Sequence, residues 1–390
     1  MRFDHRTAAL TVAGMINFLN MYSIQAVLPV MAQDFEVSVA QTGLTITATT
    51  AAIALVAPII GSISDRFGRK RLIVGAMWAL ILPTLLSATA PTLDMLILWR
   101  FVQGLMMPFI FAVTVAYIGD ETEGAEMIRL TGIYSMGTIF GGFFGRFLAG
   151  FTADLAGWRA SFMVLAACTT LSALYVGAAL PRETRFRPVR GLRNTMAGFA
   201  DHITNRRLLA TYAVGFTVLF SIVTAFTYAN FLLAAPPYNL GPGALGSIFV
   251  VYMVGMVTTP IATRLAIRFG RLNTLALAVA GAVGGLLLTL LPSLIAIIAG
   301  LGMIAGAVFV QGALAIGFIG TVARHAKSAA VGLYVTFYYI GGSLGGIAPA
   351  GIWHVAGWPG CVALSILMQV LMLAIAATFW RERAERRADG

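Results

Sequence analysis

Long apolar runs, separated by short polar segments, dominate this sequence. A helix needs roughly 20 apolar residues, at about 1.5 Å each, to cross the hydrocarbon core of a membrane. Runs of about this length recur along the whole chain. They predict twelve helices, over residues 8–32, 40–62, 72–89, 95–118, 128–153, 160–180, 209–234, 245–266, 273–291, 293–316, 329–353 and 360–380.

The first run, residues 8–32, can be compared with the apolar part of a signal peptide. It exceeds the roughly 7 to 15 residues of such a segment and further spans follow it, so we expect an uncleaved first helix. A membrane β-barrel would instead show short alternating strands. The predicted fold class is therefore an all-α membrane protein with twelve transmembrane helices.

The charged residues add an orientation to this pattern. The 390 residues are 59% hydrophobic and 11% charged, and the net charge is +11. Of the 26 Lys and Arg residues, all but Arg100, Arg146 and Arg159 lie at the termini or in loops after even-numbered helices. Basic residues accumulate on the cytoplasmic side of membrane proteins, so both termini are expected there. The charge thus indicates topology in a bacterial inner (cytoplasmic) membrane and no nucleic-acid partner.

An internal repeat divides the chain into two halves. Residues 132–158 align without gaps with 332–358 and share eight identities, including Trp158 with Trp358. Residues 66–69 and 268–271 both read Arg-Phe-Gly-Arg, at nearly the same offset. Transporters are often built from such repeats, with the binding site between them. The expected domains are a six-helix bundle over 1–180, a basic cytoplasmic linker over 181–206, and a second bundle with a short cytoplasmic tail over 207–390.

The loop after the second predicted helix carries a glycine- and charge-rich motif. Residues 61–71 read Gly-Ser-Ile-Ser-Asp-Arg-Phe-Gly-Arg-Lys-Arg. A carboxylate beside several guanidiniums can form a latch between conformations. The motif resembles Gly-x-x-x-Asp-Arg-x-Gly-Arg-Lys/Arg of the major facilitator superfamily, whose fold is two pseudo-symmetric six-helix bundles. The resemblance implies a latch that includes acids at the end of the fourth helix: Gly61, Asp65, Arg66, Gly68, Arg69, Lys70, Asp120 and Glu121.

Two predicted spans contain an arginine. Arg100 lies in Leu-Ile-Leu-Trp-Arg-Phe-Val-Gln-Gly, similar to a second motif of the family, and the resemblance implies a role in proton coupling and helix packing. Its alternative is to extend to the outer interface, because it is about six residues from the helix end. Arg146 follows a glycine-rich segment near the family's antiporter motif, although Gly142 stands where Pro is usual. This form resembles the drug:proton antiporter branch of the family, and within it the YnfM-like efflux permeases.

Glycines recur in the fifth and eleventh predicted helices. Small residues allow membrane helices to approach closely, so helix packing is the expected role. The glycines concerned are Gly137, Gly141, Gly142, Gly145, Gly341, Gly342 and Gly345.

The resemblance places the substrate cavity between the halves, lined by the first, fourth, seventh and tenth helices. The candidate cavity residues are the polar ones there: Asn17, Asn20, Tyr22, Gln25, Gln103, Thr224, Tyr228, Asn230 and Gln311. Each has the alternative of bonding a neighbouring helix, for about 0.6 kcal/mol.

No Asp or Glu lies deep in a predicted span, which disfavours cationic cargo. Arg100 and Arg146 favour anionic or neutral amphipathic cargo, unless outer carboxylates such as Asp34 and Asp94 neutralise them. Such a pair could itself respond to protons, so Asp34 joins the two arginines as a proton-coupling or packing candidate.

The leading hypothesis is proton-coupled efflux of a small organic compound by alternating access, and the alternative is proton-coupled uptake of a small organic anion. An enzyme and a channel are disfavoured, because no acid–base cluster is visible and the repeats predict rocking around a central site. We expect no cofactor and no metal site; Cys168 and Cys361 lie in separate spans. The expected partners are the substrate, protons and membrane lipids, and the protein is expected to be a monomer.

Overall fold

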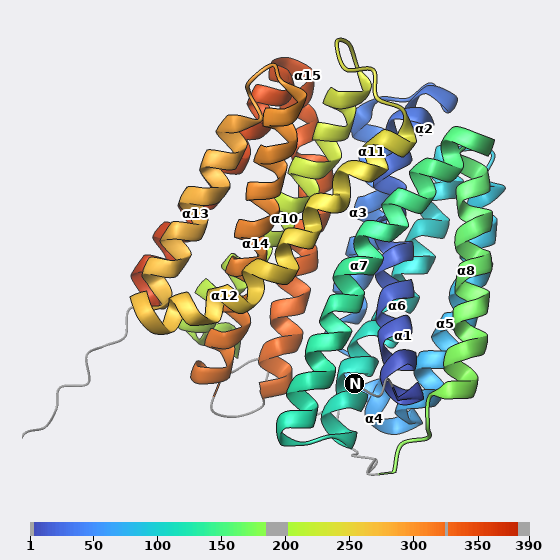
Figure 1. The fold of residues 1–390 in the computed structure, drawn as a ribbon, viewed down its shortest axis with the longest axis vertical. Helices are drawn as coiled ribbons and strands as arrows, with labels where there is room; N and C mark the ends of the chain where they lie inside the picture. Colours follow the sequence, from blue (N-terminus) through green and yellow to red (C-terminus); the bar gives the residue numbers. More distant parts are fainter. Residues whose placement is uncertain (1–3, 185–201, 324–326, 381–390) are drawn as a thin grey trace, which may run out of the picture.

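The computed structural model describes residues 4–184, 202–323 and 327–380, and this part of the chain is almost entirely helical (Figure 1). The first half forms α1 (His5–Tyr22), η1 (Ser23–Val27), α2 (Leu28–Asp34), α3 (Val39–Val56), α4 (Ile60–Phe67), α5 (Arg69–Ala88), α6 (Leu93–Glu121), α7 (Gly124–Ala156) and α8 (Trp158–Ala179). The second half forms α10 (Arg206–Ala234), α11 (Pro242–Ile248), η2 (Phe249–Met253), α12 (Val254–Phe269), α13 (Arg271–Leu288), α14 (Leu294–Val322) and α15 (Lys327–Phe379). Of the predicted linker, residues 185–201 lie outside the described part.

The helices form two groups that stand side by side in Figure 1, α1–α8 on the right and α10 and α12–α15 to their left, while the short α11 reaches over the upper part of α7. Within the groups, α7 packs along α1 and the first part of α15 packs along α10. Between the groups, α3 meets α15 and α7 meets α11. The interface between the groups therefore runs along four helices that the repeat relates in pairs.

By length and composition, ten helices of the described residues can cross a membrane. The predicted number of twelve is therefore not reproduced by this criterion, for two reasons. The predicted helices over 329–353 and 360–380 are two helices that follow one another without a loop, and they are counted as one span, α15, although Gly357 between them is not helical (φ 58°, ψ −149°). The predicted helix over 128–153 forms α7, which is helical over 33 residues but is not among the ten.

Three predicted spans contain a local change of helix type. The first is interrupted by η1 and the eighth by η2, each a 3-10 segment of five residues. The second is broken between α3 and α4 by a turn that contains Pro58, which has no N–H to donate to a helix. In a 3-10 segment the carbonyls lose their usual partner four residues on, so side chains can bind them.

Glycines permit the closest helix contacts in both groups. A Cβ on Gly141 of α7 would overlap the backbone of Met15 in α1, and one on Gly145 would overlap Leu19. In the second group, a Cβ on Gly345 would lie 2.6 Å from the carbonyl oxygen of Phe220 in α10. These contacts hold α7 against α1, and α15 against α10, at backbone distance.

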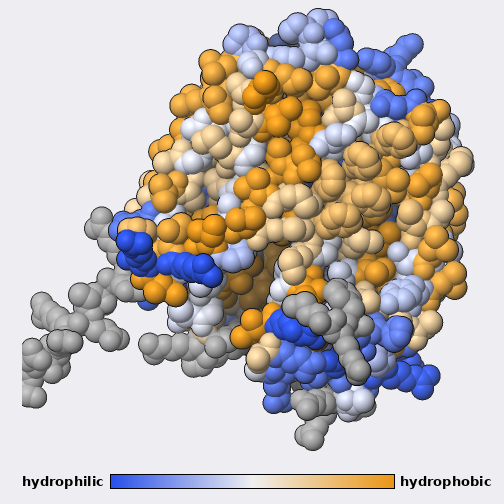
Figure 2. Space-filling view, viewed as in Figure 1, coloured by the Kyte–Doolittle hydropathy of each residue, from blue (hydrophilic) through white to orange (hydrophobic). Residues whose placement is uncertain are grey.

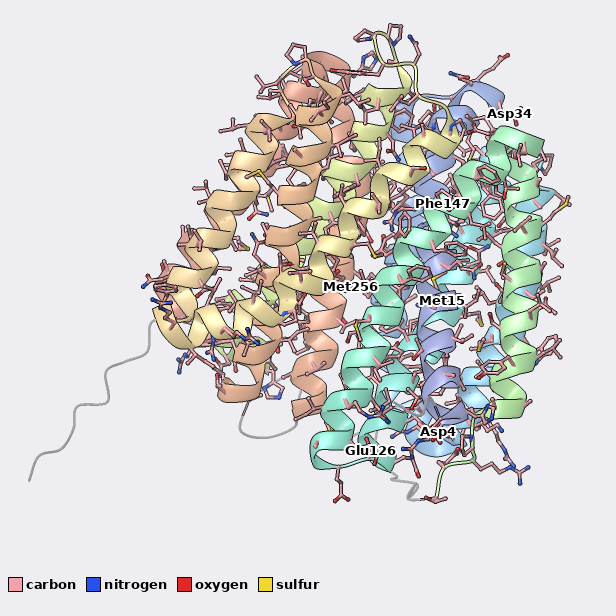
Figure 3. All side chains as sticks on the ribbon, in the orientation of Figure 1. Asp4, Met15, Asp34, Glu126, Phe147 and Met256 are labelled. Carbon is pink, nitrogen blue, oxygen red and sulfur yellow. The ribbon has the colours of Figure 1, made fainter. Side chains whose placement is uncertain are left out.

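The two ends of the molecule differ. The upper end in Figure 3 carries Asp34, and the lower end carries Asp4 and Glu126. Between them the surface is an apolar belt (Figure 2). Large apolar side chains are correspondingly exposed, Leu171 to 67% and Ile295 to 82%. Water would make such exposure unfavourable, whereas lipid does not. Toward the lower end, Figure 2 also shows the face hollowed between the two groups.

Candidate functional site

Arg100 in α6 binds the C-terminal end of α1. Its guanidinium donates hydrogen bonds to the carbonyl oxygens of Asn20 (3.1 Å) and Met21 (2.6 Å), just before η1 begins. The 3-10 segment frees these carbonyls, and a cation is favourable at the negative end of a helix dipole. The side chain is fully buried, so it does not extend to the outer interface. The predicted alternative of an interfacial Arg100 is wrong.

Gln103 extends this network to α5. Its Oε1 accepts a hydrogen bond from Arg100, and its Nε2 donates to Thr84 Oγ1 (3.3 Å) and Ser87 Oγ (3.1 Å). Three helices, α1, α5 and α6, thus share one buried polar chain. The Nε of Arg100 has no hydrogen-bond partner in the described structure. This donor remains available inside the first helix group.

Arg146 in α7 lies in an aromatic cage built from both halves of the chain. Its guanidinium carbon is 4.6 Å from the ring centroid of Tyr22, 4.3 Å from that of Phe249 and 4.8 Å from that of Tyr252. Cations are attracted to the faces of aromatic rings within about 6 Å, and the attraction is stronger without water. The cage therefore stabilises a charge that is otherwise costly to bury.

Gln25 connects this arginine to the second half. Arg146 donates from Nε (2.7 Å) and from Nη2 to Gln25 Oε1. Gln25 Nε2 donates to Thr227 Oγ1 (3.0 Å), and Asn230 Nδ2 donates to the carbonyl of Gln25 (2.7 Å). Thr227 and Asn230 both lie in α10. The pair of Arg146 and Gln25 thus joins α7, η1 and α10, in the upper part of the molecule.

Two further contacts join the halves, one near the middle of α3 and of the first part of α15, and one near the upper end of α7. Ser343 in α15 binds α3, through Thr50 Oγ1 (2.9 Å) and through its carbonyl, which accepts from Thr47 (2.8 Å). Asp154 in α7 accepts from the backbone N–H of Gly243 in α11 (2.9 Å). The two groups are therefore bonded at and above the centre and hollow below.

Neither Arg100 nor Arg146 has a carboxylate partner within 4 Å in the described residues. Asp34, one of the two candidates for neutralising them, binds Arg159 (2.7 Å) and the indole N–H of Trp158 (3.0 Å) instead. The ion pairs among described side chains involve other residues. Carbonyls, an amide and aromatic rings thus hold both charges.

A second cluster lies at the lower end, around the motif after α4. The Nε of Arg69 donates to Asp120 at the end of α6 (2.9 Å), and its Nη1 donates to Ser64. Glu121 accepts from the backbone N–H and hydroxyl of Thr184, both 2.8 Å away. The side chain of Asp65, the central acid of the predicted latch, lies outside the described part of the structure. Of that latch, the structure places Arg69 beside Asp120.

The predicted cavity residues are all buried, and most of them bind neighbouring helices. Thr224 and Tyr228 donate to the carbonyls of Gly345 (3.1 Å) and Gly346 (2.9 Å) in α15. Asn20 binds Thr169 in α8 (2.9 Å), and Gln311 binds Gln369 in α15 (2.8 Å). Tyr22, Gln25, Gln103 and Asn230 belong to the two arginine networks described above, and Asn17 has no hydrogen-bond partner in the described structure. These polar groups therefore mainly hold helices together.

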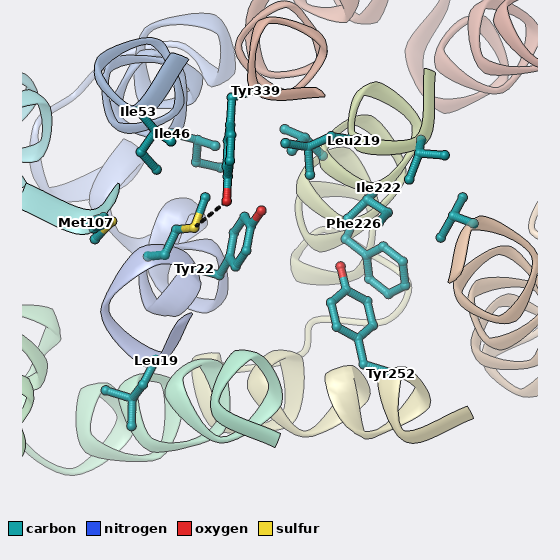
Figure 4. Packing of buried hydrophobic residues seen from close by; sticks show 14 of the residues in the cluster. Leu19, Tyr22, Ile46, Ile53, Met107, Leu219, Ile222, Phe226, Tyr252 and Tyr339 are labelled. Atoms are coloured by element: carbon teal, nitrogen blue, oxygen red, sulfur yellow. Dashed lines mark hydrogen bonds between the residues drawn. The ribbon is translucent and has the colours of Figure 1, made fainter. Parts of the chain in front are cut away.

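Aromatic rings, which the sequence prediction did not single out, line the space between the groups. Phe18 lies 6.0 Å from Phe111, Phe111 lies 6.0 Å from Tyr339, and Tyr339 lies 5.3 Å from Tyr338, between ring centroids. Phe18, Phe111 and Tyr338 are only partly buried. Figure 4 shows the Tyr339 hydroxyl directed at the sulfur of Met21, 3.9 Å away, with Tyr22 nearby. This aromatic row joins α1, α6 and α15.

Among the site residues that the sequence prediction missed, three have partners that are distant in sequence. Phe249, Tyr252 and Ser343 carry no motif, and each becomes visible only when helices of both halves are brought together. The sequence signal that could have found them was the residue type: an aromatic residue at the break in a span, or a hydroxyl residue in a glycine-rich part of a span.

Comparisons with known proteins place these features in a family. The family model of the Major Facilitator Superfamily matches residues 10–346. The inner membrane transport protein YnfM of Escherichia coli is 30% identical over 97% of this chain and 91% of its own. An uncharacterized transporter of Bacillus subtilis, YybF, is 27% identical over 99% and 96%.

Solved structures share the fold at low identity. The nucleoside transporter NupG aligns with a TM-score of 0.77 at 13% identity, over 96% of this chain and 99% of its own. A bacterial homolog of the human lysosomal transporter Spinster, in an inward-facing and unoccupied conformation, aligns with a TM-score of 0.73 at 17% identity, over 97% of both chains.

Proposed function

The chain belongs to the Major Facilitator Superfamily, and from this premise we propose that it exports a small neutral or anionic amphipathic compound in exchange for protons. It is a multi-pass membrane protein and a secondary transporter of the family's kind, not an enzyme. The direction of transport, the cargo class and the proton coupling are the proposal. In it, the lower end faces the cytoplasm, because the basic loops around Arg69 and Arg271 lie there.

One observation supports the alternating-access part of the proposal: bonds between the halves gather at and above the centre, while the face below is hollow. Gln25 alone connects Arg146 to Thr227 and Asn230 across the interface. Opening the upper end would require these bonds to break, and closing the lower end would require new ones. Two inexact repeats that rock around a central site are suited to this exchange.

The cargo class follows from charge and apolar surface. Arg100 and Arg146 are held without carboxylates in the described structure, so the interior is electropositive and repels cations. The partly buried rings of Phe18, Phe111 and Tyr338 offer apolar and aromatic contacts beside it. An uncharged or anionic compound with an apolar ring fits both properties.

Proton coupling is assigned to the network around Arg100. The guanidinium, Gln103, Thr84 and Ser87 form a continuous hydrogen-bonded chain in the first helix group. Arg146 is assigned the contact between the halves, and Asp34, through Arg159, the packing of the upper end. The protein acts as a monomer, with protons and membrane lipids as its other partners.

The test is the intracellular accumulation of neutral, anionic and cationic compounds in an efflux-deficient bacterium. Cells carry wild-type protein, Arg100→Ala, Arg264→Ala as an exposed-arginine control, or an empty vector, each with and without a protonophore. We expect lower accumulation with wild type and Arg264→Ala. The protonophore and Arg100→Ala should abolish the difference at equal membrane expression.

The second candidate function, uptake of a small organic anion, rests on the same two uncompensated guanidiniums. It predicts the opposite sign in this assay. Higher accumulation of anions with wild type than with vector would overturn export and establish uptake. A wild-type effect that persists with the protonophore would contradict proton drive.

A further inference from the structure

A cleft of about 770 Å³ opens at the lower end of the first helix group, away from the space between the halves. It lies where α5 begins and α8 ends. Its lining combines basic side chains with a short apolar wall: Arg66, Phe67, Gly68, Lys70, Arg71, Val74, Gly177, Arg182 and Glu183.

Four of the lining side chains are basic, and none of the four has a carboxylate within ion-pair distance among the described side chains. The one acid, Glu183, is engaged elsewhere: its two carboxylate oxygens accept from the backbone N–H groups of Arg69 (3.0 Å) and Lys70 (3.2 Å). It therefore caps the N-terminus of α5 rather than neutralising the basic side chains. The cleft keeps an excess of positive charge and free donors.

The other wall of the cleft continues into the lipid-facing surface. Val74 and Gly177 line its inner part, on α5 and α8. Farther along the same two helices, Trp78, Leu174 and Tyr175 are 45%, 53% and 38% exposed. Tyr and Trp are typical of the level at which headgroups meet acyl chains. Basic charge at the membrane end thus passes directly into an apolar surface.

We propose that this cleft binds the phosphate of an anionic phospholipid, whose acyl chains lie along α5 and α8. The basic side chains supply charge-assisted donors to phosphate oxygens, and arginines bind phosphate in a bidentate manner. Free inorganic phosphate would use the charge but leave the adjoining apolar surface without a role. The assignment is independent of cargo and of transport direction.

The second half offers a matched comparison. Its motif repeats Arg66 as Arg268, but Leu272 and Asn273 stand where Lys70 and Arg71 stand in the first. The corresponding site therefore lacks two of the basic side chains. Binding of a lipid in the cleft should therefore depend on basic side chains of the first half alone.

The experiment uses the purified full chain in a neutral detergent, with lipid binding followed by native mass spectrometry and by thermal unfolding. The ligands are dioleoylphosphatidylglycerol, dioleoylphosphatidylcholine and soluble glycerol phosphate. The cleft variant is Arg71→Gln with Arg182→Gln. The control variant is Arg264→Gln with Arg268→Gln, which removes two exposed charges from α12 in the other half.

We expect phosphatidylglycerol to bind and stabilise the wild type and the control variant. Binding of phosphatidylglycerol to the cleft variant should be about 30-fold weaker, because each of the two missing basic side chains contributes about a fivefold increase in affinity for an anionic lipid. Equal losses in both variants, or equal binding of phosphatidylcholine, would overturn the site. If glycerol phosphate stabilised the protein as much as phosphatidylglycerol does, the ligand of the cleft would be a free phosphate compound and not a lipid. If the double variant does not fold, Arg182→Gln alone, in the non-helical segment after α8, gives the same comparison.

Discussion

The two halves use the same scaffold but differ in the chemistry that they bury. Arg146 in α7 corresponds in the repeat to Gly346 in α15. Where the first half holds a guanidinium bonded to Gln25, the second has only a backbone carbonyl that accepts from Tyr228 (2.9 Å). The eighth residue of α6 is Arg100, and the eighth of α14 is Leu301. Both buried arginines therefore belong to the first half.

The lower-end contacts differ in the same way. Arg69 pairs with Asp120, the twenty-eighth residue of α6, at 2.9 Å. Its counterpart Arg271 contacts Thr321, the twenty-eighth residue of α14, at 3.5 Å. A charged pair is thus replaced by a long, weaker hydrogen bond. The repeat preserves helix geometry, whereas the charges that can respond to ligand or protons are concentrated in one half.

The shared scaffold predicts the largest effect. Gly141→Ala and Gly341→Ala should each destabilise the protein by about 3 kcal/mol, because the new methyl group would overlap the backbone of α1 or α10. Gly132→Ala in α7 is the control, since no atom lies within 4 Å of its added Cβ. The measurement is the loss of folded protein in detergent as the temperature rises, followed by size-exclusion chromatography of the heated samples. A clear difference between the two halves would contradict a common scaffold.

The difference between the halves predicts an intermediate effect. Arg146→Met should lower transport at least tenfold, because Gln25 loses its donors and an unsatisfied buried group costs about 1–3 kcal/mol. Arg146→Lys keeps the charge but loses the two-nitrogen contact to Gln25, so it should restore transport only in part. The measurement is the transport rate of each variant at matched membrane expression. Full activity of Arg146→Met would contradict the role assigned to Arg146.

The smallest effect is expected at the lower end. A double-mutant cycle of Arg69→Gln and Asp120→Asn should give a coupling of about 0.5 kcal/mol, because Asp120 is partly exposed. The coupling should shrink as salt is added. The cycle of Arg271→Gln and Thr321→Val should give a smaller value that does not depend on salt. Chemical unfolding measures both coupling energies. Equal values for the two cycles would contradict the proposed difference between the halves at the lower end.

Much of the fold was determined by the sequence alone. Apolar runs of membrane length predict helices because the backbone has no other partner in lipid, and the family follows from the motifs around Arg66 and Arg100. The glycine spacing in 137–145 and 341–345 predicts close helix contacts for the same local reason. These properties depend on residues that are near one another in the chain.

Tertiary structure alone decided which polar groups meet. Thr224 and Tyr228, predicted to line the cavity, bind the backbone of α15, and Asp34 binds Arg159. The cage around Arg146 draws Tyr22 from one half and Tyr252 from the other. A buried polar side chain takes whichever partner the packed helices bring to it, and that partner can be far away in the sequence, 205 residues between Asn230 and Gln25 and 293 between Thr50 and Ser343. Local pattern carries no information on such a pairing.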